Sequence, residues 1–148
     1  MAASGDVLRY QAHGEGFRKL IHEVVKDDPG DSITLVGHSL GGVACFELLV
    51  AEEIQRVDRL VTVGSQAPYL YEIGALTSLP FSEPLPPHFP EDWLNVYDRN
   101  DLLAYVGGGL FSGHVLDHQV DNGQPFPQAH SAYWKNDEFW KAVAPWAR

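Results

Sequence analysis

Cysteine, positive charge and long apolar runs are scarce in this sequence, and each shortage argues against a class of protein. A single cysteine, Cys45, cannot form an internal disulfide, so the fold does not depend on an oxidising compartment. Lysine and arginine total 10 against 20 aspartate and glutamate residues, and the net charge of -10 repels phosphate backbones, which argues against nucleic acid as a partner. No stretch approaches the ~20 apolar residues that a membrane span needs.

The start of the chain also lacks the features of an export signal. Residues 1–6 carry neither a basic stretch nor an apolar core, so we expect a cytoplasmic protein; a leader removed from a longer parent would leave export open. The length of 148 residues, with 45% hydrophobic and 20% charged residues, is typical of one globular domain. We therefore predict a single domain over residues 1–148.

Helical periodicity is present in three segments. Between residues 16 and 26 the apolar residues recur every three or four positions, and the proline and glycine at 29–30 end the pattern. Residues 43–56 repeat this spacing, and residues 136–144 begin with Asn136, a side chain suited to capping a helix. Each segment is predicted to be a helix with one apolar side against a core.

Short apolar runs alternate with these helices. Residues 32–36 and 59–63 are apolar and rich in β-branched side chains, a third run covers residues 92–97, and a weaker fourth covers residues 115–121. Strands that alternate with helices predict an α/β fold, a mostly parallel sheet with flanking helices. In such sheets functional groups collect beyond the carboxyl ends of the strands.

Two loops are distinguished by their composition. Residues 77–91 contain five prolines, and we expect a stiff surface connection there, with a wall or lid over a substrate pocket as the alternative. Residues 107–109 are three glycines, a pattern that fits either a hinge or a turn. The sequence contains no internal repeat and no domain linker.

The segment G-H-S-L-G at residues 37–41 fits the pattern G-x-S-x-G, after a predicted strand and before a predicted helix. A sharp strand-to-helix turn needs small residues around its serine, so we expect side chains at Gly37 and Gly41 to collide with neighbouring backbone. Ser39 would then be exposed in a strained conformation. The helix that begins at Leu40 brings N–H groups to the same place, and the Leu40 N–H is the first expected donor to an oxyanion.

With the glycine that follows, residues 37–42 (G-H-S-L-G-G) resemble the nucleophile elbow of serine lipases and esterases in the α/β-hydrolase superfamily. The resemblance extends through L-V-T-V-G-S at residues 60–65 and covers the chain from about residue 17 to its end. It implies a truncated α/β-hydrolase fold, the order nucleophile, acid, histidine along the chain, a small-molecule ester as substrate and no cofactor.

The acid of such a site is expected after the strand predicted at residues 92–97. A serine becomes a good nucleophile when a histidine removes its proton and a carboxylate orients that histidine. Asp101 lies in N-D-L-L at residues 100–103, which resembles the Asn-Asp turn that carries the acid in many lipases, and it is the expected acid. Asp98 is the alternative, and the aspartate that is not used is expected to cap the loop.

His130 is the expected base, because it lies between the last predicted strand and the closing helix, where the family has its histidine loop. His114 and His118 also follow the acid, at a spacing that would suit a metal pair on a helix. They lie on or beside a predicted strand, so we expect ordinary polar residues and no metal site. His38 is expected to pack beside the nucleophile and to contact substrate.

The expected substrate is a small neutral ester. Phe81, Phe111 and Phe126, near the predicted mouth of the site, suit an acyl chain better than a charged group and are expected to contact substrate. The acidic net charge gives no steering toward anionic phospholipid. Cys45 is expected to be a small core residue.

The region before the nucleophile strand is short for the family. About 31 residues precede that strand, whereas the family has several strands there and a loop that supplies a second oxyanion N–H. H-G-E-G at residues 13–16 could be such a loop after a short strand at 6–12, but it leads directly into a helix, so a helix-leading turn is favoured. The nucleophile strand would then have one unpaired edge. We expect that edge to be covered by the N-terminal segment, a second copy of the chain or a longer parent.

The function predicted from the sequence is hydrolysis of carboxylic esters by an esterase or lipase. Ser39 would attack the ester carbonyl, His130 would relay the proton, and Asp101 would orient His130. Two other functions stay open. One is a catalytically weak or silent α/β module used for assembly or binding, including a homo-oligomer formed through the unpaired edge; the other is an acyltransferase, which uses the same three residues.

Overall fold

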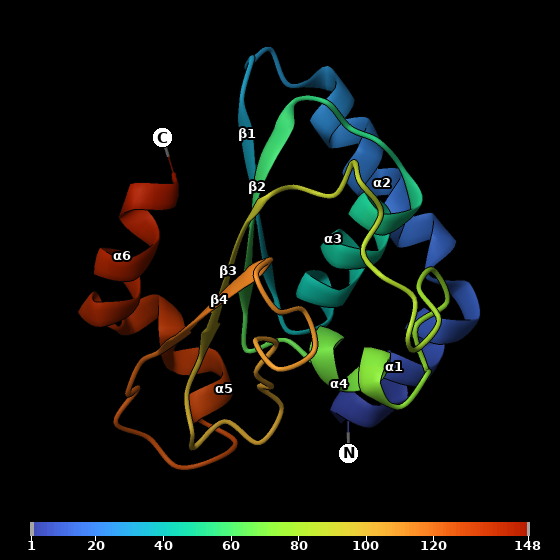
Figure 1. Ribbon diagram of the computed structural model, residues 1–148. Helices are drawn as coiled ribbons and strands as arrows, with labels where there is room; N and C mark the ends of the chain where they lie inside the picture. The colour runs from blue at the N-terminus through green and yellow to red at the C-terminus, as the bar shows by residue number, and fades with distance from the viewer. Residues whose placement is uncertain (1, 148) are drawn as a thin grey trace.

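The computed structural model describes the backbone of residues 2–147 and the side chains of residues 5–147. One sheet of four parallel strands runs through its centre, in the spatial order β1-β2-β3-β4 (Figure 1). The strands are β1 Ile33–His38, β2 Val57–Val63, β3 Asp92–Tyr97 and β4 Val115–Gln119. The predicted α/β class, with a mostly parallel sheet and flanking helices, is confirmed.

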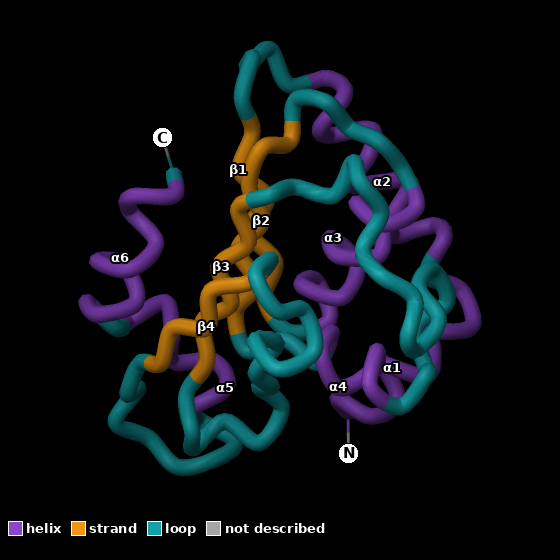
Figure 2. The backbone as a smooth tube through the Cα atoms, in the orientation of Figure 1, coloured by secondary structure: helices purple, strands orange, loops and turns teal. Residues whose placement is uncertain are grey.

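Helices cover both faces of the sheet, as Figures 1 and 2 show. On one face lie α1 Ala2–His13, α2 Glu15–Asp27, α3 Leu40–Ala51 and α4 Ala67–Glu72. On the other lie α5 Ala129–Ala132, the short 3-10 turns Tyr133–Lys135 and Ala144–Trp146, and α6 Asp137–Val143. None of the helices in residues 2–147 combines the length and apolarity needed to cross a membrane.

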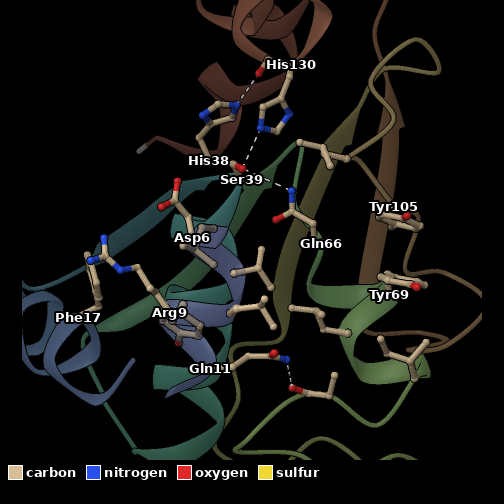
Figure 3. Close-up of a pocket in the computed structure, with 18 of the residues that line it drawn as sticks. Asp6, Arg9, Gln11, Phe17, His38, Ser39, Gln66, Tyr69, Tyr105 and His130 are labelled. Carbon is tan, nitrogen blue, oxygen red and sulfur yellow. Dashed lines mark hydrogen bonds between the residues drawn. The ribbon is translucent and has the colours of Figure 1, made fainter. Parts of the chain in front are cut away.

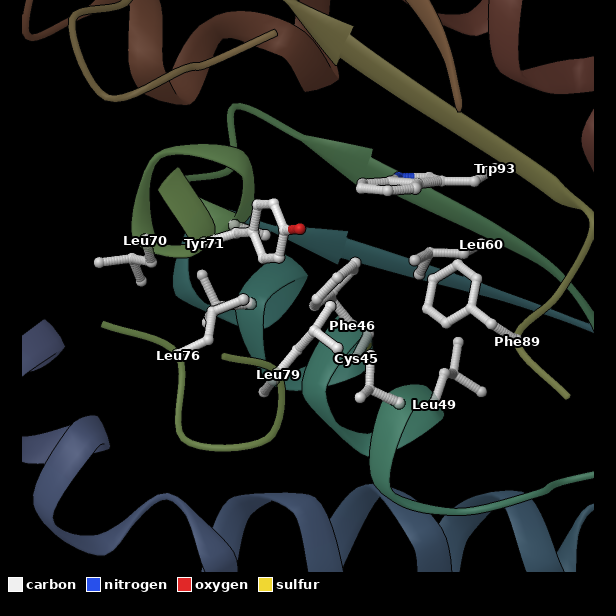
Figure 4. Packing of buried hydrophobic residues seen from close by; sticks show 14 of the residues in the cluster. Cys45, Phe46, Leu49, Leu60, Leu70, Tyr71, Leu76, Leu79, Phe89 and Trp93 are labelled. Carbon is white, nitrogen blue, oxygen red and sulfur yellow. The ribbon is translucent and has the colours of Figure 1, made fainter. Parts of the chain in front are cut away.

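Two hydrophobic cores form because the central strands are apolar on both sides. Leu60 of β2 pairs in register with Trp93 of β3, and both face the first set of helices. The next pair, Val61 and Leu94, faces the second set. Figure 4 shows the first core, where Phe46 of α3 packs beneath the sheet. Burial on both faces explains why these strands are nearly continuous apolar runs rather than alternating ones.

The helix predicted over residues 43–56 runs from Leu40 to Ala51. Its middle residues are buried all round, because the sheet lies on one side and α2 on the other. The chain leaves the helix at Glu52, and Arg56 instead donates hydrogen bonds to carbonyl oxygens at the end of α2, 2.7 Å from that of Val25 and 2.6 Å from that of Asp28. Strand β2 therefore begins at Val57, two residues before its predicted start.

The N-terminal segment is helical, so the short strand that was the less favoured alternative for residues 6–12 is not formed. These residues belong to α1, where Tyr10 is 2% exposed and Gln11 donates from Nε2 to the carbonyl oxygen of Ala75 at 2.7 Å. No strand within residues 2–147 pairs with the outer side of β1. The expected unpaired edge is present, and the N-terminal segment does not cover it.

The proline-rich segment 77–91 is a surface connection between α4 and β3. Leu79 and Phe89 are buried in the first core, and Nε2 of His88 lies 3.1 Å from the carbonyl oxygen of Val50 on α3. Most other residues of the segment are at least partly exposed. Through these contacts the segment packs against α3 and the first core.

The carboxylate of Glu47 anchors the helices of the first face. It is 1% exposed, and its Oε1 accepts hydrogen bonds from the N–H and hydroxyl groups of Thr77 and Ser78 at 2.7–3.2 Å. Its Oε2 lies 3.3 Å from the Arg18 guanidinium of α2, which also donates to the Tyr10 hydroxyl of α1. Burial alone would raise the pKa of this carboxyl, but its hydrogen bonds outweigh burial and hold the pKa below its ordinary value of 4.5.

Substitution of Glu47 tests this anchor. Glu47→Gln keeps the size of the side chain and removes its charge, so we expect the free energy of unfolding to fall by roughly 2–3 kcal/mol at neutral pH. Because the folded-state pKa is depressed, the difference should be constant above about pH 6 and shrink as the pH falls through that pKa. Urea unfolding across this range measures it, with exposed Glu53→Gln as the control. An equal loss at every pH would contradict the prediction.

Candidate active site

Ser39 lies at the turn between β1 and α3 with a positive φ of 55° and a ψ of -124°. Few residues other than glycine adopt such a conformation, which costs ~1–3 kcal/mol unless the surroundings impose it. Here the Ser39 N–H donates to the carbonyl oxygen of Val63 on β2 at 2.8 Å, and the Ser39 carbonyl accepts from the N–H of Gly42 at 3.0 Å. The backbone on both sides of the serine is therefore held in place, and the serine side chain points away from the sheet.

The small residues that this turn needs are Gly37 and Gly42. A Cβ on Gly37 would lie 2.6 Å from the carbonyl oxygen of Gly41 and 2.7 Å from the α-carbon of Gly42, which confirms the expected collision there. A Cβ on Gly42 would lie 2.6 Å from the Ser65 hydroxyl oxygen. The same expectation for Gly41 is wrong, because a Cβ there meets no described atom within 4 Å. Gly41 faces open space, whereas Gly42 packs against the end of β2.

These three glycines give a matched stability test. Gly37→Ala and Gly42→Ala should each lower the free energy of unfolding by about 1–3 kcal/mol, because the new methyl group overlaps atoms that are held in place. Gly41→Ala should raise it by up to ~1 kcal/mol, since alanine is the better helix former and has room. Thermal and urea unfolding measure the shifts. A Gly41→Ala protein destabilised as much as Gly37→Ala would show that the turn packs differently.

The three residues expected to act together are in contact. Nε2 of His130 lies 2.8 Å from Oγ of Ser39, and Nδ1 of His130 lies 2.9 Å from Oδ2 and 3.0 Å from Oδ1 of Asp101. Ser39 follows β1, Asp101 follows β3, and His130 follows β4 on α5. Figure 3 shows the imidazole of His130 directed at Ser39 at one end of a pocket. Asp101 fixes the proton on Nδ1, so Nε2 is free to accept the proton of the serine hydroxyl.

The carboxylate of Asp101 is held by groups other than His130. Its side chain is fully buried, Oδ1 accepts from the N–H of Leu103 at 3.0 Å, and Oδ2 accepts from the hydroxyl of Tyr133 at 2.8 Å. Burial and the neighbouring charge of Asp101 raise the pKa of Tyr133, so its hydroxyl stays protonated and donates. Sequence reasoning missed Tyr133; the available signal is its spacing of three residues from His130, one helical turn.

Asp98, the alternative acid, is a loop cap. Its Oδ1 accepts from the N–H of Asn100 at 2.8 Å and its Oδ2 from the N–H of Asn122 at 2.7 Å. Its own N–H donates to the hydroxyl of Tyr133 at 3.0 Å. Both carboxylate oxygens of Asp98 therefore accept hydrogen bonds from backbone N–H groups, and the carboxylate that contacts His130 is that of Asp101.

Gly64, at the end of β2, makes room for the pair of His130 and Asp101. It has a φ of 55°, and a Cβ there would lie 2.8 Å from Oδ2 of Asp101 and 3.4 Å from Nδ1 of His130. A side chain at this position would push the carboxylate away from the imidazole. The glycine at 64 lies in the segment that resembles the hydrolase family, but its role is visible only in three dimensions.

His38 supports His130 from the other side. Its ring lies 4.8 Å from the ring of His130, centre to centre, and its Nε2 lies 2.6 Å from the His130 carbonyl oxygen. Burial lowers the pKa of His38 and outweighs the hydrogen bond, which acts in the opposite direction. A neutral His38 then donates from Nε2 to that carbonyl. It lies beside the nucleophile, as expected, and also lines the pocket.

A cavity of about 960 Å³ opens beside Ser39 and His130. Its walls come from α1, the serine turn, α4 and the loop after β3, and they are largely apolar: Val7, Leu8, Leu40, Leu70, Ile73 and Tyr105 are among them. Figure 3 shows how these elements surround it. Sequence reasoning missed the contribution of α1, because a helix was not expected there.

The phenylalanines expected to contact substrate do not line this cavity, and neither do the other residues of segment 77–91. Phe111 is 4% exposed and packs on Phe46 and Trp93 in the first core. Phe81 is exposed and lies edge-on against Tyr71, while Phe126 is 40% exposed in the loop before α5. The three phenylalanines come from separate loops, and their apolar character alone did not indicate which loops reach the site.

H-G-E-G at residues 13–16 is the turn between α1 and α2, as favoured. Gly14 precedes α2, its carbonyl oxygen accepts from the N–H of Arg18 at 3.0 Å, and a Cβ there would lie 2.8 Å from the ring of Tyr10. The absence of a side chain at Gly14 therefore lets the turn pack closely against Tyr10 of α1. The N–H of Leu40 remains at the start of α3, where a first-turn N–H has no acceptor within its own helix.

The remaining polar candidates do not line the cavity beside Ser39. Asp117 of β4 accepts hydrogen bonds from the N–H groups of Gly107 and Gly108 at 2.7–3.1 Å, which makes the glycine segment a fixed turn rather than a hinge. His114 and His118 are exposed, and residues 5–147 contain no group of three potential metal ligands. Cys45 is buried in the first core as expected, and burial raises the pKa of its thiol to about 11.

Comparison with known proteins gives no assignment for this chain. No family model matches it, and neither does any curated protein or solved structure. What the chain does is therefore inferred from the arrangement of its own residues. That arrangement places a serine in a strained turn, an imidazole and a buried carboxylate in one line beside an apolar cavity.

Proposed function

We propose that this protein is a serine hydrolase that cleaves carboxylic esters, an esterase or lipase of the α/β-hydrolase type. The observation that carries the proposal is the chain of hydrogen bonds from Ser39 through His130 to Asp101, at 2.8 and 2.9 Å. Its order along the sequence is that of the resembled family, and each member follows a different parallel strand. A small-molecule ester is the expected substrate, and the cytoplasm remains the expected compartment.

The reaction follows from the positions of the polar atoms. Oγ of Ser39 attacks the ester carbonyl carbon while its proton passes to Nε2 of His130. The carbonyl electron pair moves onto oxygen, beside the N–H of Leu40 at the N-terminus of α3. The new C–O bond to the serine remains as the bond to the alcohol breaks, and the alcohol leaves with the proton from His130. Water, deprotonated by His130, then releases the acid and restores Ser39.

The shape and lining of the cavity support an apolar ester. Its walls include Leu40, Leu70 and Ile73, which offer contact to an acyl or alcohol chain. They also include Asp6 and Arg9, whose opposite charges offset each other, so the lining gives no net counter-charge. The net charge of -10 likewise gives no attraction to anionic headgroups. We therefore expect neutral esters with a chain of several carbons to be preferred over acetate esters.

Replacement of the nucleophile tests the activity. Wild-type protein should release p-nitrophenol from p-nitrophenyl esters and react with a fluorophosphonate probe, and Ser39→Ala should lose both. Ser112→Ala, an exposed serine in the loop before β4, is the matched control and should behave as wild type. Absence of labelling in the wild type, or labelling that persists in Ser39→Ala, would reject the proposal.

Replacement of Asp101 and replacement of Asp98 should have clearly different effects on kcat. Asp101→Asn keeps the shape of the site but no longer fixes the proton on Nδ1 of His130, so kcat should fall by about 10³–10⁴. Asp98→Asn should keep kcat within about tenfold and lower the stability of the loop, since its carboxylate accepts only from backbone N–H groups. Ester hydrolysis and thermal unfolding of both variants measure the effects. The reverse ranking of kcat would place the acid at Asp98.

One observation favours a second candidate function, that of an assembly module. The outer side of β1 is unpaired within the described residues, and Val36 on this strand is 44% exposed. Such an edge is a template for another strand, in a second copy of the chain or in another partner. This function and acyl transfer to an alcohol are both compatible with the same fold, and the labelling experiment with Ser39 distinguishes the silent module from the enzyme.

A further inference from the structure

Gln66 is the polar side chain that reaches Ser39 from the side opposite His130. It follows the end of β2 and directly precedes α4, and it lines the cavity. Its Nε2 lies 3.4 Å from Oγ of Ser39, a long contact for a hydrogen bond. Figure 3 shows its amide nitrogen directed at Ser39.

The carboxamide oxygen of Gln66 is buried without a partner. Gln66 is 6% exposed, and its Oε1 is the only buried side-chain polar atom among the described residues that has no hydrogen bond. An unpaired buried polar atom costs ~1–3 kcal/mol. The backbone of the residue is nonetheless well held, because its carbonyl oxygen accepts from the N–H of Leu70 at 2.9 Å and that of Ser65 accepts from the N–H of Tyr105 at 3.2 Å. The amide is thus placed by rigid backbone, while its polar end is incompletely bonded.

Stabilisation of an oxyanion calls for a second hydrogen-bond donor besides the N–H of Leu40. The N–H of Leu40 is one donor, and the turn at residues 13–16 serves helix packing instead. Ester hydrolysis develops a full negative charge on the carbonyl oxygen, and one N–H stabilises it less than two do. The nitrogen of Gln66 is already adjacent to the oxygen atom that forms the new bond.

We propose that the side-chain amide of Gln66 is the second oxyanion donor of the site, and so a further catalytic residue; this inference rests on the proposed ester hydrolysis. When Oγ of Ser39 bonds to the carbonyl carbon, its proton moves to His130 and the carbonyl electron pair moves onto oxygen. Nε2 of Gln66 donates one N–H to that oxygen, as the N–H of Leu40 does. The amide keeps its proton throughout, and the hydrogen bond is released when the carbonyl re-forms.

The reason that Gln66 can take this role lies in the sheet. β2 is the direct neighbour of β1, so the residue that follows β2 emerges beside the residue that follows β1. The Ser39 hydroxyl donates its hydrogen bond to Nε2 of His130. The lone pairs of Oγ can then only accept, so the donor end of the Gln66 amide, its nitrogen, faces Oγ. At 3.4 Å from Oγ, the amide nitrogen is near enough to reach a carbonyl oxygen that lies beside Oγ on the attacked carbon.

The test compares variants that differ in this one donor. Gln66→Met removes the amide at similar size, and Gln66→Glu keeps an acceptor oxygen but replaces the N–H donors with a negative charge. Both should lower kcat for p-nitrophenyl ester hydrolysis by about 10–10³-fold with KM changed less than about threefold, and Gln66→Glu should be the slower. A trifluoromethyl ketone, which forms an oxyanion on the serine, should bind Gln66→Met at least tenfold more weakly. Gln119→Met, an exposed glutamine on β4, is the control.

The outcomes separate this inference from the proposed function. If the wild type hydrolyses esters through Ser39 and Gln66→Met retains kcat and ketone affinity within about threefold, Gln66 is not an oxyanion donor although the hydrolase stands. If KM rises while kcat is unchanged, the amide only binds substrate and the inference is overturned. Thermal unfolding of each variant excludes a folding defect, and Gln66→Glu answers the question if Gln66→Met is unstable. A wild type that neither labels nor hydrolyses esters overturns both.

Discussion

The site depends on one close approach of backbone to backbone, at the turn that carries Ser39. Gly37 lies so near the first turn of α3 that a single methyl group would overlap the carbonyl of Gly41. That contact lets the chain reverse from strand to helix within a few residues and holds the serine at positive φ. The hydroxyl is thereby presented beyond the sheet, and the start of α3 faces the same point. A larger residue at 37 would move the Ser39 hydroxyl and the N–H of Leu40 together.

The parallel sheet brings the other groups to that point. Its strands run side by side in sequence order, so whatever follows β1, β2, β3 and β4 emerges at the same edge. Ser39, Gln66, Asp101 and His130 follow the four strands in turn. Most of the contacts that orient them are buried, since Asp101 and Tyr133 are 2% and 0% exposed. Hydrogen bonds in such surroundings are less weakened by water than they would be at the surface.

The N-terminal helix gives the site its shape without joining the sheet. α1 packs on the first face through Tyr10, and its position is fixed by the network around the buried carboxylate of Glu47. It contributes one wall of the cavity next to Ser39. Within residues 2–147, no strand pairs with the outer edge of β1. The cavity beside Ser39 and the unpaired edge of β1 are therefore two separate features of the described residues.

Local patterns in the sequence predicted the four strands, the helices α2, α3 and α6, and the serine turn, while the resemblance to the hydrolase family supplied the order of Ser39, Asp101 and His130. Apolar periodicity and turn chemistry involve residues close together in the chain, and so they can be read without knowing the fold. Tertiary structure alone decided that α1 is a cavity wall, that Phe111 is a core residue, and that Gln66 faces the nucleophile. These features depend on the order of the strands in the sheet and on how the loops pack over the strand ends. Such contacts join residues far apart in sequence, and no local pattern specifies them.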